Sequence, residues 1–204
     1  MKKIAIIGSG SWGVALGVHL AKLGNQVKIW SYKQEEADLI NNERKCKFLP
    51  DLIVPDGIMC TTSYEEAIND TEIILHVTPS KVTRENIKQY KQYVKDQTIV
   101  ICSKGFEKDT LFTLDEVFEE ELPNNKIVAL SGPSHAEEVS IGVPTAIVIA
   151  AKDENIANEI RDVFMNENLR IYTSTDIKGV ELRRSSKKYY SILLRNWCWN
   201  GTWR

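Results

Sequence analysis

Short apolar runs alternate with amphipathic stretches along most of this chain, and the alternation predicts a repeating order of strands and helices. In the first unit, Ile4, Ile6 and Ile7 form a strand-like run, Gly8 interrupts it, and apolar residues at helical spacing follow until Gly24. Further strands are expected at 26–30, 58–61, 71–77, 97–103, 126–130, 144–151 and 169–173, and helices at 34–42, 81–93, 111–122 and 154–165. Strands that alternate with helices indicate an α/β fold with a mostly parallel sheet.

Local signals add detail to the regions between these elements. Ser63 and Ser134 each have a glutamate three residues later, a spacing that predicts a capped helix start. The three consecutive glutamates at 119–121 are interpreted as a solvated helix face. Residues 44–57 contain two prolines and are expected to form a loop.

A glycine motif follows the first strand directly. Gly8, Gly10 and Gly13 have the spacing G-x-G-x-x-G, and the helix-like stretch begins within it. The first glycine of such a motif permits a tight turn, the second lets the backbone approach a pyrophosphate, and the third lets the helix pack on the strand. Backbone N–H groups at a helix N-terminus bind such phosphates. Since a strand precedes the motif and a helix follows it, the context predicts a Rossmann-like, doubly wound fold rather than an unrelated glycine-rich turn.

The end of the second predicted strand bears on the choice of dinucleotide. A site specific for NAD places Asp or Glu there, about 20 residues past the glycines, to bind the ribose 2′-hydroxyl. This chain has Ser31, Tyr32 and Lys33 instead. A lysine and a missing carboxylate favour a 2′-phosphate, so the expected cofactor is NADP, with NAD kept open. The alternative is that Lys33 is a solvated surface lysine.

Other strand ends supply further candidates, because loops at the carboxyl ends of parallel strands line the ligand crevice. Residues 78–80 and Lys104 follow two such strands. An ammonium at a strand end suits a phosphate or a carbonyl that gains negative charge, although an exposed loop lysine is an equal alternative. His76 lies within an apolar strand and is expected to be a core histidine rather than a catalyst.

Composition excludes several classes of function. The formal net charge of -2 over 204 residues argues against nucleic acid bound by bulk electrostatics. The four cysteines are scattered without a C-x-x-C pair, so neither a metal site nor a disulfide framework is expected, and reduced thiols fit a cytoplasmic protein. No stretch reaches the ~20 apolar residues of a membrane helix. The apolar run at the N-terminus stops at Gly8, too early for a signal peptide.

Taken together, seven stretches resemble bacterial NAD(P)-dependent glycerol-3-phosphate dehydrogenase. They are GSGSWGVAL, FLPD, VTPS, SKGFE, SGPSHAEEV, GVPTA and YTSTDIKGVEL. They follow the family's order from Met1 to Leu182, and their combination is highly specific. The resemblance implies interconversion of sn-glycerol 3-phosphate and dihydroxyacetone phosphate in glycerophospholipid synthesis, and it allows a homodimer in full-length members. The alternatives are a non-catalytic dinucleotide-binding module and a related dehydrogenase that acts on another hydroxy acid or sugar.

The resemblance also implies roles for individual residues. Cofactor contacts are implied for Gly8, Gly10, Ser11, Trp12, Gly13, Tyr32, Lys33, Lys104 and Ala136. Substrate contacts are implied for Lys104, Gly132 and Ser134. Lys187 aligns with the family's catalytic proton acceptor, and Lys104 touches both cofactor and substrate.

The chain departs from the family after Leu182. Family members continue as Gly-Gly-Ala-Leu-Lys-Asn-Ile-Ile into an all-helical substrate domain, whereas residues 183–190 read RRSSKKYY and three tryptophans follow within 197–203. Tryptophan has the single codon TGG, so a one-base shift of frame turns each of these tryptophans into glycine. Permitted codons for 183–190 likewise shift to the family sequence. We therefore expect a dinucleotide-binding domain at 1–182, a frameshifted tail at 183–204 that lacks the substrate domain, and little or no activity of this chain.

Overall fold

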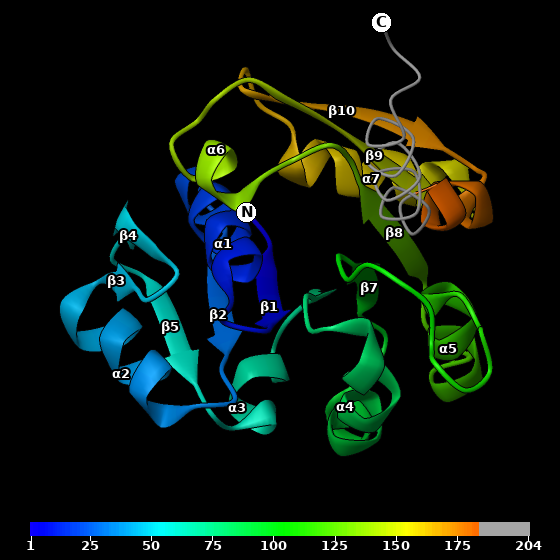
Figure 1. Ribbon diagram of the computed structural model, residues 1–204, viewed down its shortest axis with the longest axis horizontal. Coiled ribbons are helices and arrows are strands. Elements are labelled where there is room, and N and C mark those ends of the chain that lie inside the picture. Colours follow the sequence, from blue (N-terminus) through cyan, green and yellow to red (C-terminus); the bar gives the residue numbers. More distant parts are fainter. Residues whose placement is uncertain (184–204) are drawn as a thin grey trace, which may run out of the picture.

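The computed structural model describes residues 1–183 of the chain. Its main feature is an eight-stranded sheet with the order β10-β9-β8-β7-β6-β1-β2-β5 (Figure 1). The strands are β1 (Lys3–Ile7), β2 (Gln26–Trp30), β5 (Ile58–Thr61), β6 (Ile73–His76), β7 (Thr98–Ile101), β8 (Ile127–Ser131), β9 (Thr145–Ala151) and β10 (Leu169–Ser174). Within the described part, every neighbouring pair of this sheet is parallel except β8 and β9. The predicted α/β class with a mostly parallel, doubly wound sheet is confirmed.

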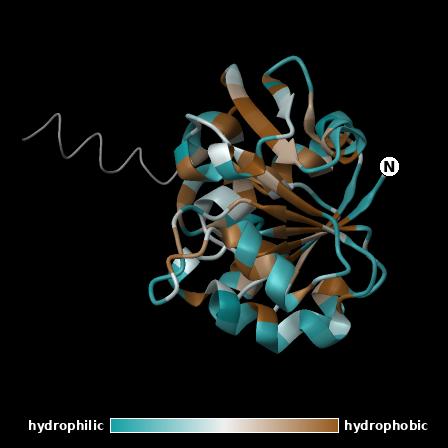
Figure 2. Ribbon diagram, turned by 90° about the vertical axis from the view of Figure 1, so that its right-hand side faces the viewer, coloured by the Kyte–Doolittle hydropathy of each residue, from teal (hydrophilic) through white to brown (hydrophobic). Residues whose placement is uncertain are grey.

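Helices cover both faces of this sheet because successive side chains of a strand point to opposite faces. In β1, Ile4 and Ile6 belong to one core cluster and Ala5 and Ile7 to the other, and all four are fully buried. The first cluster packs against α1 (Ser11–Lys22), α2 (Gln34–Glu43), α6 (Ala136–Ser140) and α7 (Glu154–Phe164). The second packs against α3 (Tyr64–Ile68), α4 (Thr83–Tyr90) and α5 (Leu114–Glu121). Figure 2 shows the resulting apolar strands between helices whose outer sides are polar.

The chain reverses its direction across the sheet at β1. From β1 it proceeds to β2 and β5 on one side, then returns to β6, β7 and β8 on the other side. Ile7 therefore pairs with Trp30 of β2 and with His76 of β6. In open α/β sheets, a crevice for ligands forms outside the carboxyl ends of the strands at such a reversal point.

Several local predictions are wrong or incomplete. Residues 44–57 are not only a loop, because β3 (Lys45–Cys46) and β4 (Leu49–Ile53) form an antiparallel hairpin there. Ser63 caps α3 as predicted and accepts a hydrogen bond from the Glu66 backbone N–H. Ser134 does not cap α6: the helix starts one residue later than expected, so His135 takes the N-cap position without a side-chain bond.

No helix within residues 1–183 is long and apolar enough to cross a membrane. Lys187 and the rest of the tail from residue 184 lie outside the described residues, so their predicted roles stay predictions.

Candidate functional site

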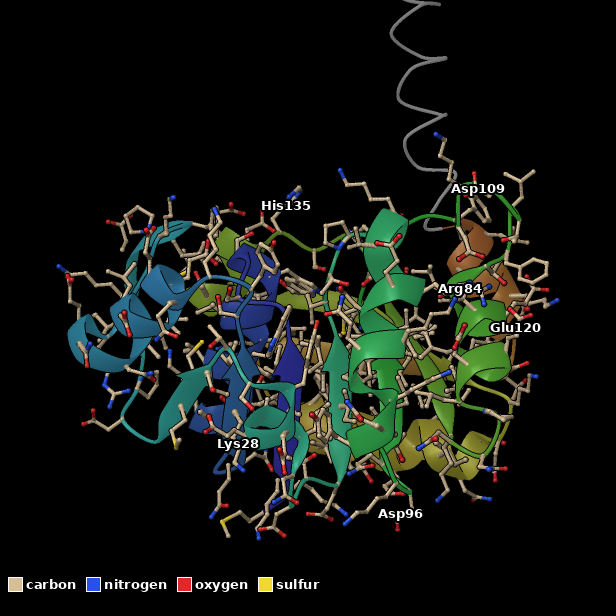
Figure 3. The ribbon with its side chains drawn as sticks, turned by 90° about the horizontal axis from the view of Figure 1, so that it is seen from below. Lys28, Arg84, Asp96, Asp109, Glu120 and His135 are labelled. Carbon is tan, nitrogen blue, oxygen red and sulfur yellow. The ribbon has the colours of Figure 1, made fainter. Side chains whose placement is uncertain are left out.

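A cleft of about 990 Å³ opens at the reversal point of the sheet. Its walls are residues 8–13 after β1, Trp30 and Tyr32 at the end of β2, 77–79, Val82, Glu85, Asn86 and Gln89 after β6, 102–104 after β7, and 134–137 after β8. Figure 3 shows His135 at this edge of the sheet, with Lys28 and Asp96 at the opposite edge. The cleft thus collects the loops that follow five strands at their carboxyl ends.

The glycine loop depends on one positive φ angle, at Gly8, and on one close approach between backbones, at Gly13. Gly8 has a φ of 128°, which L side chains rarely adopt. A Cβ on Gly13 would lie 2.1 Å from the Gly8 carbonyl oxygen, so only glycine lets α1 start this close to the strand. A Cβ on Gly10 would meet nothing within 4 Å, which leaves that side of the loop open.

The start of α1 fits an anionic group. Gly10 is its N-cap, no side chain caps the helix, and the first turn contains no acidic residue. The first N–H groups of a helix lack intrahelical partners and carry partial positive charge. The buried Trp12 Nε1, in the same wall of the cleft, also has no hydrogen-bond acceptor among the described residues. These donors and the open side of Gly10 fit the pyrophosphate of a dinucleotide.

Most of the predicted site residues meet in this cleft. Gly8, Gly10, Ser11, Trp12, Gly13, Tyr32, Lys104, Ser134 and Ala136 line it. Lys33 and Gly132 are not part of its lining. Lys33 is exposed at the N-cap of α2, and Gly132 packs against β9, where a Cβ would lie 2.7 Å from a side-chain carbon of Ile147.

A carboxylate that the sequence prediction missed lies at the end of β2. Glu36, on the first turn of α2, accepts a hydrogen bond from the Ser9 hydroxyl at 2.7 Å, and its carboxylate lies 3.5 Å from the Ser31 hydroxyl. Ser9 and Ser31 are both buried, and their hydroxyl oxygens are 2.8 Å apart. The premise that this end of the strand lacks a carboxylate is therefore wrong, because α2 folds back over it.

His76 connects the loops on the β6 side of the cleft. Its ring is fully buried, with Nε2 2.8 Å from the Thr78 hydroxyl and Nδ1 3.2 Å from the Tyr90 hydroxyl. Its carbonyl oxygen accepts bonds from the Cys102 N–H and the Ser103 hydroxyl, next to Lys104. Burial lowers the pKa of His76 to about 3, so the imidazole is neutral at physiological pH. The predicted core histidine is confirmed, and it also positions Thr78 and Ser103 at the cleft wall.

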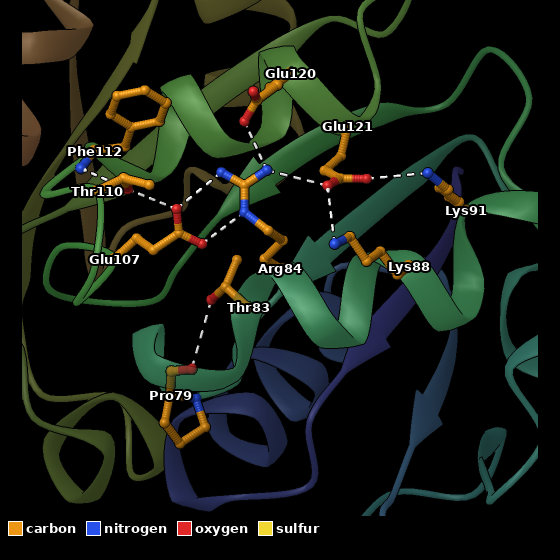
Figure 4. Close-up of polar contacts among 10 residues, drawn as sticks. All are labelled: Pro79, Thr83, Arg84, Lys88, Lys91, Glu107, Thr110, Phe112, Glu120 and Glu121. Atoms are coloured by element: carbon orange, nitrogen blue, oxygen red, sulfur yellow. Dashed lines mark hydrogen bonds and ion pairs between the residues drawn. The ribbon is translucent and has the colours of Figure 1, made fainter.

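An ion-pair cluster centred on Arg84 fixes the loop that continues from Lys104 (Figure 4). Arg84 donates to both carboxylate oxygens of Glu107, at 2.7 and 2.8 Å, and to Glu121 at 3.1 Å. Glu120 lies 2.6 Å from the same guanidinium. Only 9% of the Glu121 side chain is exposed, so the prediction of a solvated face for 119–121 is wrong at this residue. The bond from Arg84 lowers the pKa of Glu107 to about 2.

Replacing Arg84 with methionine is expected to destabilise the fold by about 2 kcal/mol, because it leaves three neighbouring carboxylates without their central cation. The lowered pKa of Glu107 makes this contribution complete above pH 4.5 and removes it as the pH falls towards 2. Urea unfolding of both proteins at neutral and acidic pH measures the difference, which should shrink on acidification. Lys88→Met is the control: Lys88 is 3.9 Å from Glu121 and 57% exposed, so its loss should cost less than about 0.5 kcal/mol. Equal costs for the two variants would contradict the assignment.

Comparison with known proteins places this geometry in a family. Two bacterial proteins named as NAD(P)+ glycerol-3-phosphate dehydrogenases are similar along the chain. The Fusobacterium nucleatum protein is 40% identical over 197 residues, and the Lactobacillus delbrueckii subsp. bulgaricus protein is 43% identical over 199 residues. Each match covers 94% of this chain. It covers 58% of the Fusobacterium protein and 59% of the Lactobacillus protein, so the chain spans a little under three fifths of the length of these relatives.

Solved structures agree with this result. Glycerol-3-phosphate dehydrogenase from Coxiella burnetii superposes with a TM-score of 0.85 at 31% identity, covering 90% of this chain and 57% of the other. The yeast enzyme, at 22% identity and a TM-score of 0.79, covers 88% of this chain and 58% of its own, and supports the fold alone. A family model described as the N-terminus of NAD-dependent glycerol-3-phosphate dehydrogenase matches residues 3–157, which is most of the chain. The chain therefore belongs to the NAD-dependent glycerol-3-phosphate dehydrogenase family and corresponds to its N-terminal part.

Proposed function

We propose that this chain binds NAD(H) or NADP(H) as the cofactor-binding part of an enzyme that interconverts sn-glycerol 3-phosphate and dihydroxyacetone phosphate, and that by itself it has little or no turnover. The observation that supports this most strongly is the uncapped start of α1 in the same cleft as Lys104. A dinucleotide needs donors for its pyrophosphate, and hydride transfer to a carbonyl needs positive charge close to the oxygen. Family membership supports the choice of substrate among the many reactions that this fold hosts.

Each group of residues in the cleft would have a separate role. The backbone N–H groups of the loop after Gly8 hold the pyrophosphate, and the bound nicotinamide supplies the hydride. Lys104, in the lining of the cleft, would contact a substrate phosphate or a carbonyl oxygen through its ammonium. Ser134, which also lines the cleft, would contribute a hydroxyl. His76 takes no part in proton transfer, because it is fully buried and neutral.

Titration with each dinucleotide, followed by a turnover assay, tests this function. NADH and NADPH are added separately to the 204-residue chain, and binding is followed through nucleotide fluorescence and the quenching of total tryptophan emission, to which Trp12 and Trp30 in the cleft wall contribute. Oxidation of the bound reduced nucleotide on addition of dihydroxyacetone phosphate then reports turnover. Binding without turnover is the expected result and leaves the dinucleotide-binding module as the activity of this chain, whereas normal turnover would overturn the expected loss of activity. No binding of either nucleotide would overturn the proposal.

Lys104→Met is expected to weaken NADPH binding by about tenfold, since a charge-assisted contact is lost. The measurement is the same fluorescence titration at constant salt. Lys108→Met removes the same charge from the same loop, but Lys108 is not part of the cleft lining, so it should leave affinity within about twofold. Equal affinities for the two variants would remove Lys104 from the cofactor site.

A further inference from the structure

Two serines and a glutamate form a polar cluster where the glycine loop meets the end of β2. Ser9 lines the cleft, and both its hydroxyl partners, Ser31 and Glu36, lie directly behind it. We propose that Glu36, acting through Ser9, lowers the affinity of the cleft for a 2′-phosphate and so opposes a preference for NADP. This inference rests on the proposed dinucleotide function and adds a residue that sets cofactor specificity.

The proton positions in the cluster follow from its donors and acceptors. An ionised carboxylate only accepts hydrogen bonds, so the 2.7 Å contact requires Ser9 to donate its single hydroxyl proton to Glu36. Ser31 receives the Lys33 N–H at 3.2 Å and can donate to the Lys33 carbonyl at 3.0 Å or to Ser9 at 2.8 Å. Ser9 is thereby held with its proton turned towards α2. Towards a ligand, the Ser9 hydroxyl oxygen can therefore act only as a hydrogen-bond acceptor.

This arrangement distinguishes the two forms of the cofactor. A ribose 2′-hydroxyl can donate a hydrogen bond, so it suits an acceptor backed by a carboxylate, which is the environment that sites specific for NAD provide at the end of the second strand. A 2′-phosphate is itself an acceptor with about two negative charges, and it would meet lone pairs and a further negative charge instead of donors. Glu36 is half-buried, so its charge is screened less than that of a fully solvated side chain.

The test compares the affinities for NADPH and NADH in two variants of neighbouring residues. Glu36→Gln removes the charge and keeps a carbonyl oxygen for the Ser9 hydroxyl, so the loop keeps its geometry. The ratio of NADPH affinity to NADH affinity should rise by about fivefold, the scale of one partly screened charge interaction. Glu35→Gln removes an equal charge from the adjacent, exposed residue of α2 and should leave the ratio within about twofold of the original. The rise should also diminish as salt is added.

The outcomes separate this inference from the proposal on which it rests. An unchanged ratio in Glu36→Gln, or an equal rise in both variants, overturns the role of Glu36 and leaves dinucleotide binding intact. Failure of the unaltered chain to bind either nucleotide overturns both. Thermal unfolding shows whether each variant is folded, and Glu36→Met repeats the measurement, with the same expected direction, if the glutamine variant is not.

Discussion

Replacing Gly13 with alanine is expected to abolish dinucleotide binding and to destabilise the fold by about 3 kcal/mol. The added methyl group would lie 2.1 Å from the Gly8 carbonyl oxygen and 3.2 Å from its carbonyl carbon. Both are backbone atoms of the turn, so no side chain can move aside. Relief of the clash requires α1 to separate from β1, which displaces the helix N-terminus from the position where it would hold the pyrophosphate. Urea unfolding and NADH titration measure the two effects.

Gly10→Ala is the matched control for this experiment. Gly10 has φ -66° and ψ 174°, which alanine adopts without strain, and a Cβ there would meet nothing within 4 Å. Stability should therefore change by less than about 0.5 kcal/mol, whereas affinity should fall because the methyl group occupies the open side of the loop. If Gly10→Ala bound NADH as well as the unaltered chain, the pyrophosphate could not lie against this loop.

His76 is expected to make the stability of the fold depend strongly on pH below about 6.5. Its pKa is about 3 in the folded protein because burial disfavours the charged ring, against an ordinary value of 6.5 in the unfolded chain. Between these two values the unfolded chain binds a proton that the folded protein does not. The contribution of His76 to the free energy of unfolding should therefore fall by about 1.4 kcal/mol for each pH unit of acidification through this window. Above pH 6.5 the contribution of His76 is constant.

Urea unfolding between about pH 5 and 6.5 covers this window. Burial lowers the pKa of His19 as well, so the contribution of His76 is taken from the difference in slope between the unaltered chain and His76→Gln. Glu107 and Glu116 have folded pKa values of about 2 against an ordinary value of 4.5, so most of their effect on stability falls below that range. His76→Gln has no titrating ring and should show a flatter dependence, whatever its stability at neutral pH. His135→Gln, a change at an exposed histidine, should keep the original slope. Equal slopes in the unaltered chain and His76→Gln would show that His76 is not buried as a neutral ring.

Much of the fold could be predicted because its signals are local. Both sheet faces are covered, so β6, β7 and β8 are continuous apolar runs that periodicity detects. The β3–β4 hairpin was missed because Pro50 and the mostly exposed residues around it resemble a loop. The reversed direction of β9 relative to β8 was not predicted either, because the side-chain pattern of a strand is the same in both directions.

Some features of the candidate site could likewise be predicted from sequence, and others could not. The glycine loop and the strand ends could be located from sequence, since backbone geometry and chain order alone place them. Glu36 was missed because a carboxylate was sought directly after β2, whereas this one reaches Ser9 from the first turn of α2. Glu121 was misinterpreted because Arg84, which buries it, comes from another helix.

By itself, the sequence determined the order of strands and helices, the glycine loop at the start of α1, and the positions at which ligand-binding loops occur. It did so because hydrophobic period, glycine conformation and turn chemistry act over a few residues. Only the tertiary structure decided which polar groups meet: Glu36 with Ser9, Arg84 with Glu107, and His76 with the hydroxyls of Thr78 and Tyr90. Such pairs depend on how separate elements pack against one sheet, and residue spacing along the chain does not record that packing.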